Sequence, residues 1–186
     1  TFDLIFSIRT LHWTNDVPGF LRQVLWSLKP DGLFLGACFA GDSLKELSQS
    51  LIEAESKLSG SIAMRISPFL KPNQAAHLLQ RAGFALPVCD IDRQTLSYSS
   101  PSRLIQDLRA GGETLSLHGE TPNLTRDIWQ ATKELYTSKF SQNDGYVDAT
   151  AHTFYLTGWA PHPRQQQALS RGSAEHSLIE YFDQET

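Results

Sequence analysis

The sequence predicts an α/β fold built around parallel strands. Two apolar runs, at residues 2–7 and 33–39, have the length and composition of buried strands. An amphipathic helix lies between them, and the turn Lys29-Pro30-Asp31-Gly32 joins that helix to the second run. A strand, a helix and a second strand in this order form a βαβ unit, which places its two strands parallel in one sheet.

The composition is ordinary for a soluble globular domain. The 186 residues are 40% hydrophobic and 19% charged, and the formal net charge is −4, so no basic surface favours nucleic acid. No apolar run approaches the roughly 20 residues of a membrane span, and no signal sequence opens the chain. We expect a cytoplasmic protein, or a mitochondrial matrix protein if the source is eukaryotic.

Cysteines and histidines give no sign of a metal site. Cys38 and Cys89 lie in apolar, strand-like segments and are interpreted as buried, reduced thiols, with a disulfide or a two-cysteine metal site as alternatives. Five further histidines lack metal-ligand spacing, so we predict no metal. They are His77, His118, His152, His162 and His176.

The first helix is predicted to begin after Asp16, which can cap it, and Pro18 is tolerated in the first turn. Its apolar residues have the spacing of a helix that packs on a sheet. Four more helices follow the second strand, and Ser43 with Glu46 has the pattern of a capping box for the first of them. They are expected at about 43–59, 72–82, 101–110 and 125–140.

Two later segments are predicted to be strands. Apolar and polar residues alternate in parts of the segment 84–98, and Pro87 restricts the first part of this segment to a sheet edge or a bulge. The turn at 143–145 leads to a last strand at 152–159. After it the composition becomes polar, so we expect one domain over residues 1–160 and a flexible tail over 161–186.

Several stretches resemble one branch of the class I S-adenosylmethionine (SAM) methyltransferases. They are Phe2-Asp3-Leu4-Ile5-Phe6-Ser7, Leu11-His12-Trp13, Leu28-Lys29-Pro30-Asp31-Gly32, Gly83-Phe84 and Gly158-Trp159. That branch includes trans-aconitate methyltransferase, the malonyl-carrier-protein methyltransferase of biotin synthesis and the complex I assembly-factor arginine hydroxylase. Residues 41–47, 66–69 and 171–174 are most similar to the assembly-factor group.

The resemblance implies a partial doubly wound, Rossmann-like methyltransferase sheet. In this family the strand order is 3-2-1-4-5-7-6, and the chain would supply strands four to seven, the last one antiparallel. The glycine-rich loop and the acidic residue that bind SAM would lie upstream of residue 1. We therefore expect the isolated chain to bind SAM weakly or not at all and to be inactive.

The function implied for the full-length protein is SAM-dependent methyl transfer to a small-molecule or carrier-bound substrate. The rival enzyme is an arginine hydroxylase and assembly factor that acts on a respiratory-complex subunit. A non-enzymatic scaffold with the same fold is the third alternative.

Site residues are expected in the loop after the first strand, because ligands bind at the carboxyl ends of parallel strands. His12 is the candidate general base, although it could simply bond the start of the helix. Trp13 could pack against that helix, and Arg9 and Glu113 could be plain surface residues. The candidates are Ser7, Ile8 and His12 for the cofactor, and Arg9, Trp13 and Glu113 for the substrate.

The resemblance also leaves the strand at residues 2–7 without a neighbour on one side. An apolar strand edge of this kind is a template for pairing with another chain. We therefore expect the fragment to self-associate.

Overall fold

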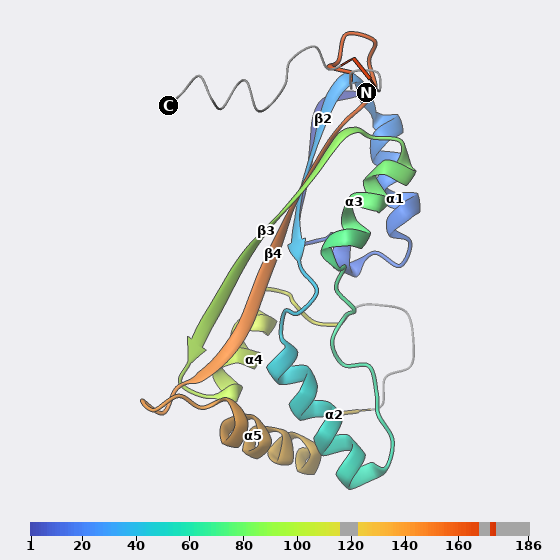
Figure 1. Cartoon of the computed structure of the whole chain (residues 1–186). Helices are drawn as coiled ribbons and strands as arrows, with labels where there is room; N and C mark the ends of the chain where they lie inside the picture. Colours follow the sequence, from blue (N-terminus) through green and yellow to red (C-terminus); the bar gives the residue numbers. More distant parts are fainter. Residues whose placement is uncertain (116–122, 168–171, 174–186) are drawn as a thin grey trace, which may run out of the picture.

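A computed structural model describes residues 1–115, 123–167 and 172–173. Its centre is a four-stranded mixed sheet in the order β1-β2-β4-β3 (Figure 1). β1 and β2 pair in parallel, and β4 runs antiparallel between β2 and β3. The α/β class, the parallel pair and the antiparallel last strand are therefore confirmed. The strands are β1 (Phe2–Ile8), β2 (Leu28–Phe39), β3 (Ala85–Tyr98) and β4 (Val147–Trp159).

Helices gather in two groups along the sheet. α1 and α3 lie together on one face of the sheet, whereas α2, α4 and α5 gather around the far ends of β3 and β4 (Figure 1). All five lie close to their predicted ranges. The helices are α1 (Val17–Ser27), α2 (Lys45–Ser59), α3 (Pro72–Ala82), α4 (Pro101–Ala110) and α5 (Arg126–Phe140), with a 3-10 turn, η1 (Leu11–Trp13), before α1.

Each helix group has its own apolar core. Leu21 of α1 and Leu79 of α3 pack with Phe34, Phe154 and others on the sheet face that these helices cover. The second core joins α2, α4 and α5 to the first half of β4, and its members include Leu47, Leu104, Tyr136, Val147 and Ala149. Both cores are at most 8% exposed in their buried members, so each group is held by burial of apolar surface.

Two helix starts test the predicted caps. The Asp16 carboxylate accepts a hydrogen bond from the Gly19 backbone N–H at 2.9 Å, so this N-cap of α1 is confirmed. The capping box at Ser43 and Glu46 is wrong. Ser43 Oγ instead donates to the Ala40 carbonyl at 2.7 Å, and the Glu46 carboxylate accepts from Thr150. Both side chains are buried and bond to neighbouring chain segments, whereas in a capping box each would accept a hydrogen bond from the backbone N–H of the other residue.

Two strands begin earlier than predicted. β2 starts at Leu28 and includes the Lys29–Gly32 turn residues, with Asp31 at φ +66°. β4 starts at Val147 because it pairs with β3 along that strand's whole length. The prediction for Pro87 is confirmed on both counts, since β3 is an edge strand and its register shifts between Ala85 and Val88.

The predicted tail begins with residues that contact the sheet. Gln165 Nε2 donates to Asp31 Oδ1 and to the Ala160 carbonyl, each at 2.8 Å. Most of the remaining tail lies outside the described residues, and so do residues 171 and 174 of the 171–174 segment that resembles the assembly-factor group. No helix in the described part of the chain combines the length and apolar content that a membrane span needs.

Candidate functional site

A cluster of polar and aromatic side chains lies at the carboxyl ends of the two parallel strands. The loop after β1 carries Arg9 and η1, and β2 ends there at Phe39. The segment before α3 and the loop after α4 approach the same place, because Phe69 and Glu113 both contact this cluster. This is the edge at which ligands bind in sheets of this type.

Arg9 directs its side chain into the cluster from a strained backbone. Its φ is +54°, a left-handed conformation that costs free energy in a residue with a Cβ, and its N–H donates to the Ala37 carbonyl at 2.7 Å. The guanidinium carbon lies 4.1 Å from the centre of the Phe39 ring. Arg9 Nε donates to Glu113 Oε1 at 2.5 Å, so the cation is held by an aromatic face and a carboxylate.

The Glu113 carboxylate is shared between two residues. Its side chain is only 5% exposed, and while Oε1 accepts from Arg9, Oε2 lies 2.7 Å from His12 Nε2. The loop reaches this position after α4 through Gly112, whose φ of +73° suits glycine, and the Glu113 N–H donates to the Leu108 carbonyl. A buried carboxylate needs such partners, because an unpaired buried charge is costly.

His12 is enclosed by aromatic rings. Its side chain is 4% exposed, and ring centres of Trp13, Phe39 and Phe69 lie 5.4–5.7 Å from the imidazole centre. Because ionised Glu113 can only accept hydrogen bonds, Nε2 carries the proton that they share. Nδ1 is buried without a hydrogen-bond partner among the described residues. In the neutral ring Nδ1 therefore has a free lone pair, which a donor from a ligand could satisfy.

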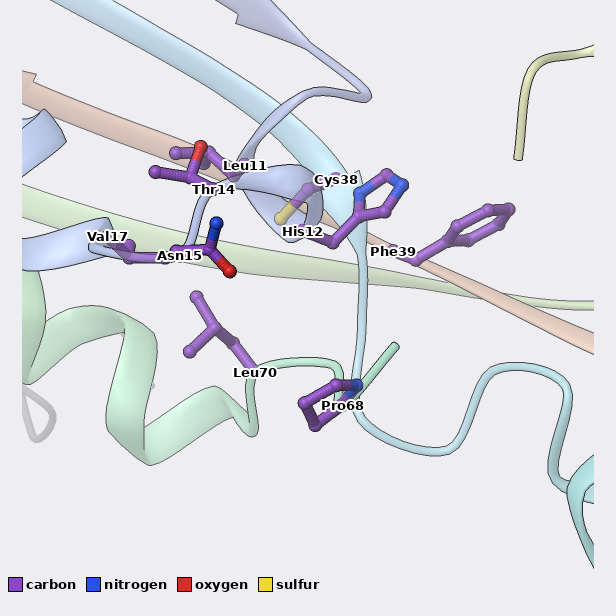
Figure 2. Close-up of a pocket in the computed structure, with 9 residues that line it drawn as sticks. All are labelled: Leu11, His12, Thr14, Asn15, Val17, Cys38, Phe39, Pro68 and Leu70. Atoms are coloured by element: carbon purple, nitrogen blue, oxygen red, sulfur yellow. The ribbon is translucent and has the colours of Figure 1, made fainter. Parts of the chain in front are cut away.

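Two cavities meet at His12 and Phe39. The smaller has a volume of about 220 Å³, and Figure 2 shows Pro68 and Leu70 across it from the segment that carries Leu11 and Thr14. The larger is a groove of about 940 Å³, a size suited to organic ligands. Its apolar part comes from α2, α4 and α5, and its polar lining includes Arg65, Ser102, Gln106, Arg109, Glu113 and Arg126.

The structure brings four of the six candidates together. Arg9, His12, Trp13 and Glu113 form one cluster, and the last three line the groove. The roles assigned to them stay predictions. The two others, Ser7 and Ile8, lie apart from this cluster. Ser7 Oγ is hydrogen-bonded to Thr10 Oγ1, and the Ile8 side chain is 61% exposed on the sheet edge.

Sequence reasoning missed two aromatic residues of the site, Phe39 and Phe69. Phe39 was interpreted as the end of a buried strand, and Phe69 only as part of a segment of resemblance. The available signal was position, because Phe39 ends a parallel strand at the edge where ligands bind.

No group of three or more metal-ligating side chains occurs in the part of the chain that the structure describes, which excludes His118 and His176. Cys38 and Cys89 are both free thiols. Burial raises the pKa of the Cys38 thiol to about 12, so the thiolate that binds metals is disfavoured there.

Comparisons with known proteins show that the chain is similar to methyltransferases in part of its sequence and in its fold. The methyltransferase domain family matches residues 1–36, which cover β1, η1, α1 and most of β2. A putative methyltransferase from Bacillus halodurans has a similar structure, with a TM-score of 0.53 and 15% identity over 87% of this chain and 65% of that chain. Similarity at this identity shows the fold alone, which is that of Rossmann-like methyltransferases.

Two of the sequence relatives have names that describe different reactions. The chain is 41% identical over 180 residues to the human arginine-hydroxylase NDUFAF5, mitochondrial, covering 97% of this chain and 52% of that protein. It is 30% identical over 182 residues to the malonyl-[acyl-carrier protein] O-methyltransferase of Laribacter hongkongensis, covering 97% and 58%. The chain thus spans about half the length of the curated relatives it matches.

Proposed function

Because this chain has a methyltransferase fold and is a homologue of arginine-hydroxylase NDUFAF5 and of malonyl-carrier-protein methyltransferases, we propose that the full-length protein hydroxylates an arginine side chain of a protein partner. Hydroxylation was the alternative at the level of sequence. We prefer hydroxylation to methyl transfer, because the chemistry of the site favours it and because the chain is more identical to the arginine hydroxylase than to the malonyl-carrier-protein methyltransferase.

The observation that carries the proposal is the buried carboxylate of Glu113 beside the Phe39 ring. In the structure this pair already binds a guanidinium, that of Arg9. A carboxylate and an aromatic face are the two groups that recognise a planar guanidinium. His12 fixes the second carboxylate oxygen at 2.7 Å and so orients the first. The groove of about 940 Å³ leaves room for the peptide that would carry the arginine.

SAM is the cofactor that the methyltransferase fold implies. The partnerless Nδ1 of His12 is a buried polar atom that fits an incoming donor such as an amino group, and Ser7 and Ile8 end β1, the strand that leads into the loop carrying His12. We propose that these three residues border the cofactor. Bound SAM would supply an electrophilic methyl group. Hydroxylation instead needs dioxygen and a two-electron reductant as co-substrates: one oxygen atom enters a C–H bond of the arginine side chain, and the other leaves as water. The part of this chain is to hold and orient the arginine.

The test uses the full-length protein with SAM, dioxygen, a two-electron reductant and purified respiratory-complex subunits, followed by mass spectrometry of their arginine peptides. We expect arginine to gain the mass of one oxygen atom. Glu113→Gln should slow this reaction more than about tenfold, since hydrogen bonds to charged groups contribute about 1.5–3 kcal/mol. Glu53→Gln is the matched control, because Glu53 bonds Lys57 and Lys139 away from the site.

A second candidate is methyl transfer to a carrier-bound acid. Arg109 and Arg126 line the same groove, and cationic side chains suit a carboxylate substrate or an acidic carrier. The same assay with a malonyl-carrier substrate separates the two reactions, because methyl transfer adds the mass of one methylene group. A folded protein that binds partners but modifies neither substrate would instead be the scaffold.

The proposed partner is a respiratory-complex subunit, in line with the assembly-factor resemblance. For a eukaryotic source the corresponding compartment is the mitochondrial matrix, because the NDUFAF5 relatives are named as mitochondrial proteins. Both stay predictions. Immunoprecipitation of the full-length protein with mass spectrometry of its partners would test them together.

A further inference from the structure

The guanidinium site at Glu113 is filled by a residue of the chain itself. Arg9 places its guanidinium over Phe39 and bonds one oxygen of Glu113. The Arg9 side chain is 47% exposed, whereas that of Glu113 is 5% exposed. The two partners therefore differ in how much they depend on the pair.

Glu113 needs a cation more than Arg9 needs the carboxylate. A buried carboxylate that loses its partner keeps the desolvation penalty of an uncompensated charge. A half-exposed arginine regains water when it leaves, and ion pairs of exposed groups contribute little to stability. Any guanidinium that reaches Glu113 can therefore replace Arg9, at the small cost of moving one surface side chain.

The backbone of Arg9 adds to this asymmetry. Its left-handed φ of +54° is disfavoured for a non-glycine residue, and such strain persists where surrounding contacts hold it. The contacts that hold Arg9 are the N–H bond to the Ala37 carbonyl and the side-chain contacts with Phe39 and Glu113. Losing the side-chain contacts removes part of what holds the strained conformation, so exchange would relax it.

We propose that Arg9 is an internal competitor that occupies the substrate-guanidinium site until an arginine side chain of the partner displaces it. The proposal rests on the proposed function in one respect, the assignment of Glu113 to a guanidinium. The new element is that substrate binding exchanges one guanidinium for another at Glu113: Arg9 occupies the site in the free protein, and the arginine of the partner occupies it in the complex. A site closed in this way binds substrate with an affinity reduced by the fraction of molecules that Arg9 occupies.

Methylguanidinium is the probe, and calorimetry on the full-length protein is the measurement. Removing the competitor in Arg9→Ala should tighten methylguanidinium binding by about tenfold, roughly 1.4 kcal/mol. Arg103→Ala is the matched control, because Arg103 is also an arginine in an ion pair, with Asp107 on the exposed side of α4, and should leave the affinity unchanged. Adding Glu113→Gln to Arg9→Ala should abolish the gain.

An affinity that is unchanged or weaker in Arg9→Ala would overturn the proposal, since Arg9 would then be part of the binding wall. Binding that is undetectable in both proteins would overturn it as well. If Arg9→Ala melts at a lower temperature than the parent, Arg9→Gln keeps the length of the side chain without its charge and gives the same test. Tighter binding without any arginine hydroxylation would support the exchange and refute only the proposed reaction.

Discussion

Gly158 of β4 lies against the ring of Phe84, at a point where no side chain fits. A Cβ at this position would lie 2.9–3.0 Å from Cδ1, Cβ and Cγ of Phe84, closer than carbon atoms pack. Phe84 is 5% exposed in the first core, so it has little room to move. Gly158→Ala should lower the free energy of unfolding by about 1–3 kcal/mol through overpacking.

Gly41 supplies the matched control for this substitution. A Cβ there would lie at least 3.6 Å from its nearest neighbours, which is ordinary contact. Denaturant unfolding of the full-length protein and both variants measures the difference. Equal stabilities of Gly158→Ala and Gly41→Ala would show that Phe84 yields and that the close approach is unimportant.

Single residues of the site could be predicted from the sequence, but not the contacts between them. His12 and Arg9 follow a strand that sequence patterns locate, so their place at its carboxyl end was accessible. Glu113 lies 101 residues after His12 along the chain, and no local pattern indicates that the two bond. Phe39 could not be predicted for another reason. The sequence does not distinguish an aromatic residue that stacks on a guanidinium from one that packs in a core.

At the scale of elements, α2 is tied to β4 by one buried carboxylate. Glu46 is 5% exposed and accepts hydrogen bonds from the backbone N–H of Thr150 at 2.9 Å and from its hydroxyl. Glu46→Gln keeps the shape but leaves one acceptor oxygen where there were two, and the bonds to Thr150 lose the assistance of the charge. The free energy of unfolding should fall by about 1–3 kcal/mol, the cost of unsatisfied buried polar groups.

Thr150→Val complements this variant, because it removes only the hydroxyl and leaves the backbone bond. Urea unfolding should show a smaller loss for Thr150→Val than for Glu46→Gln. A larger loss for Thr150→Val would mean that the hydroxyl, and not the backbone bond, holds the two elements together.

The same contact explains why the start of α2 was mispredicted. Ser43 and Glu46 have capping-box spacing, and local pattern alone favours bonds between them and the helix start. In the structure His152 and Thr150 of β4 offer these side chains backbone partners within a buried interface. The N-cap position passes to Leu44 in a left-handed conformation. Helix extents, in contrast, follow apolar periodicity and stop residues, and these were predictable.

At the scale of the whole molecule, one face of the sheet is apolar and exposed near β1 and β2, beyond the part that α2, α4 and α5 cover. Phe6, Leu35, Thr157 and Val88 are register partners across the four strands, so they share one face. Phe6, Leu35 and Val88 are 67%, 38% and 57% exposed. The parallel pairing and the antiparallel last strand were accessible from the sequence, since βαβ order and the resemblance fix them. Only the register of the four strands shows that these exposed apolar residues lie side by side on one face.

This open face and the free edge of β1 predict that the 186-residue chain associates when it is produced by itself. Apolar patches of this kind favour contact with other molecules, and an unpaired edge strand offers backbone hydrogen bonds to a second chain. Light scattering after size exclusion should give a mass above that of the 20.8 kDa monomer, rising with concentration. Phe6→Lys should shift the population towards the monomer, because the charge would be buried in any contact through this face.

Trp26→Lys is the matched control. Trp26 is 72% exposed on α1, a helix that covers the opposite face, and its substitution should leave the association intact. A chain that stays monomeric at all concentrations, or that responds to both substitutions alike, would show that the open face does not drive the contact.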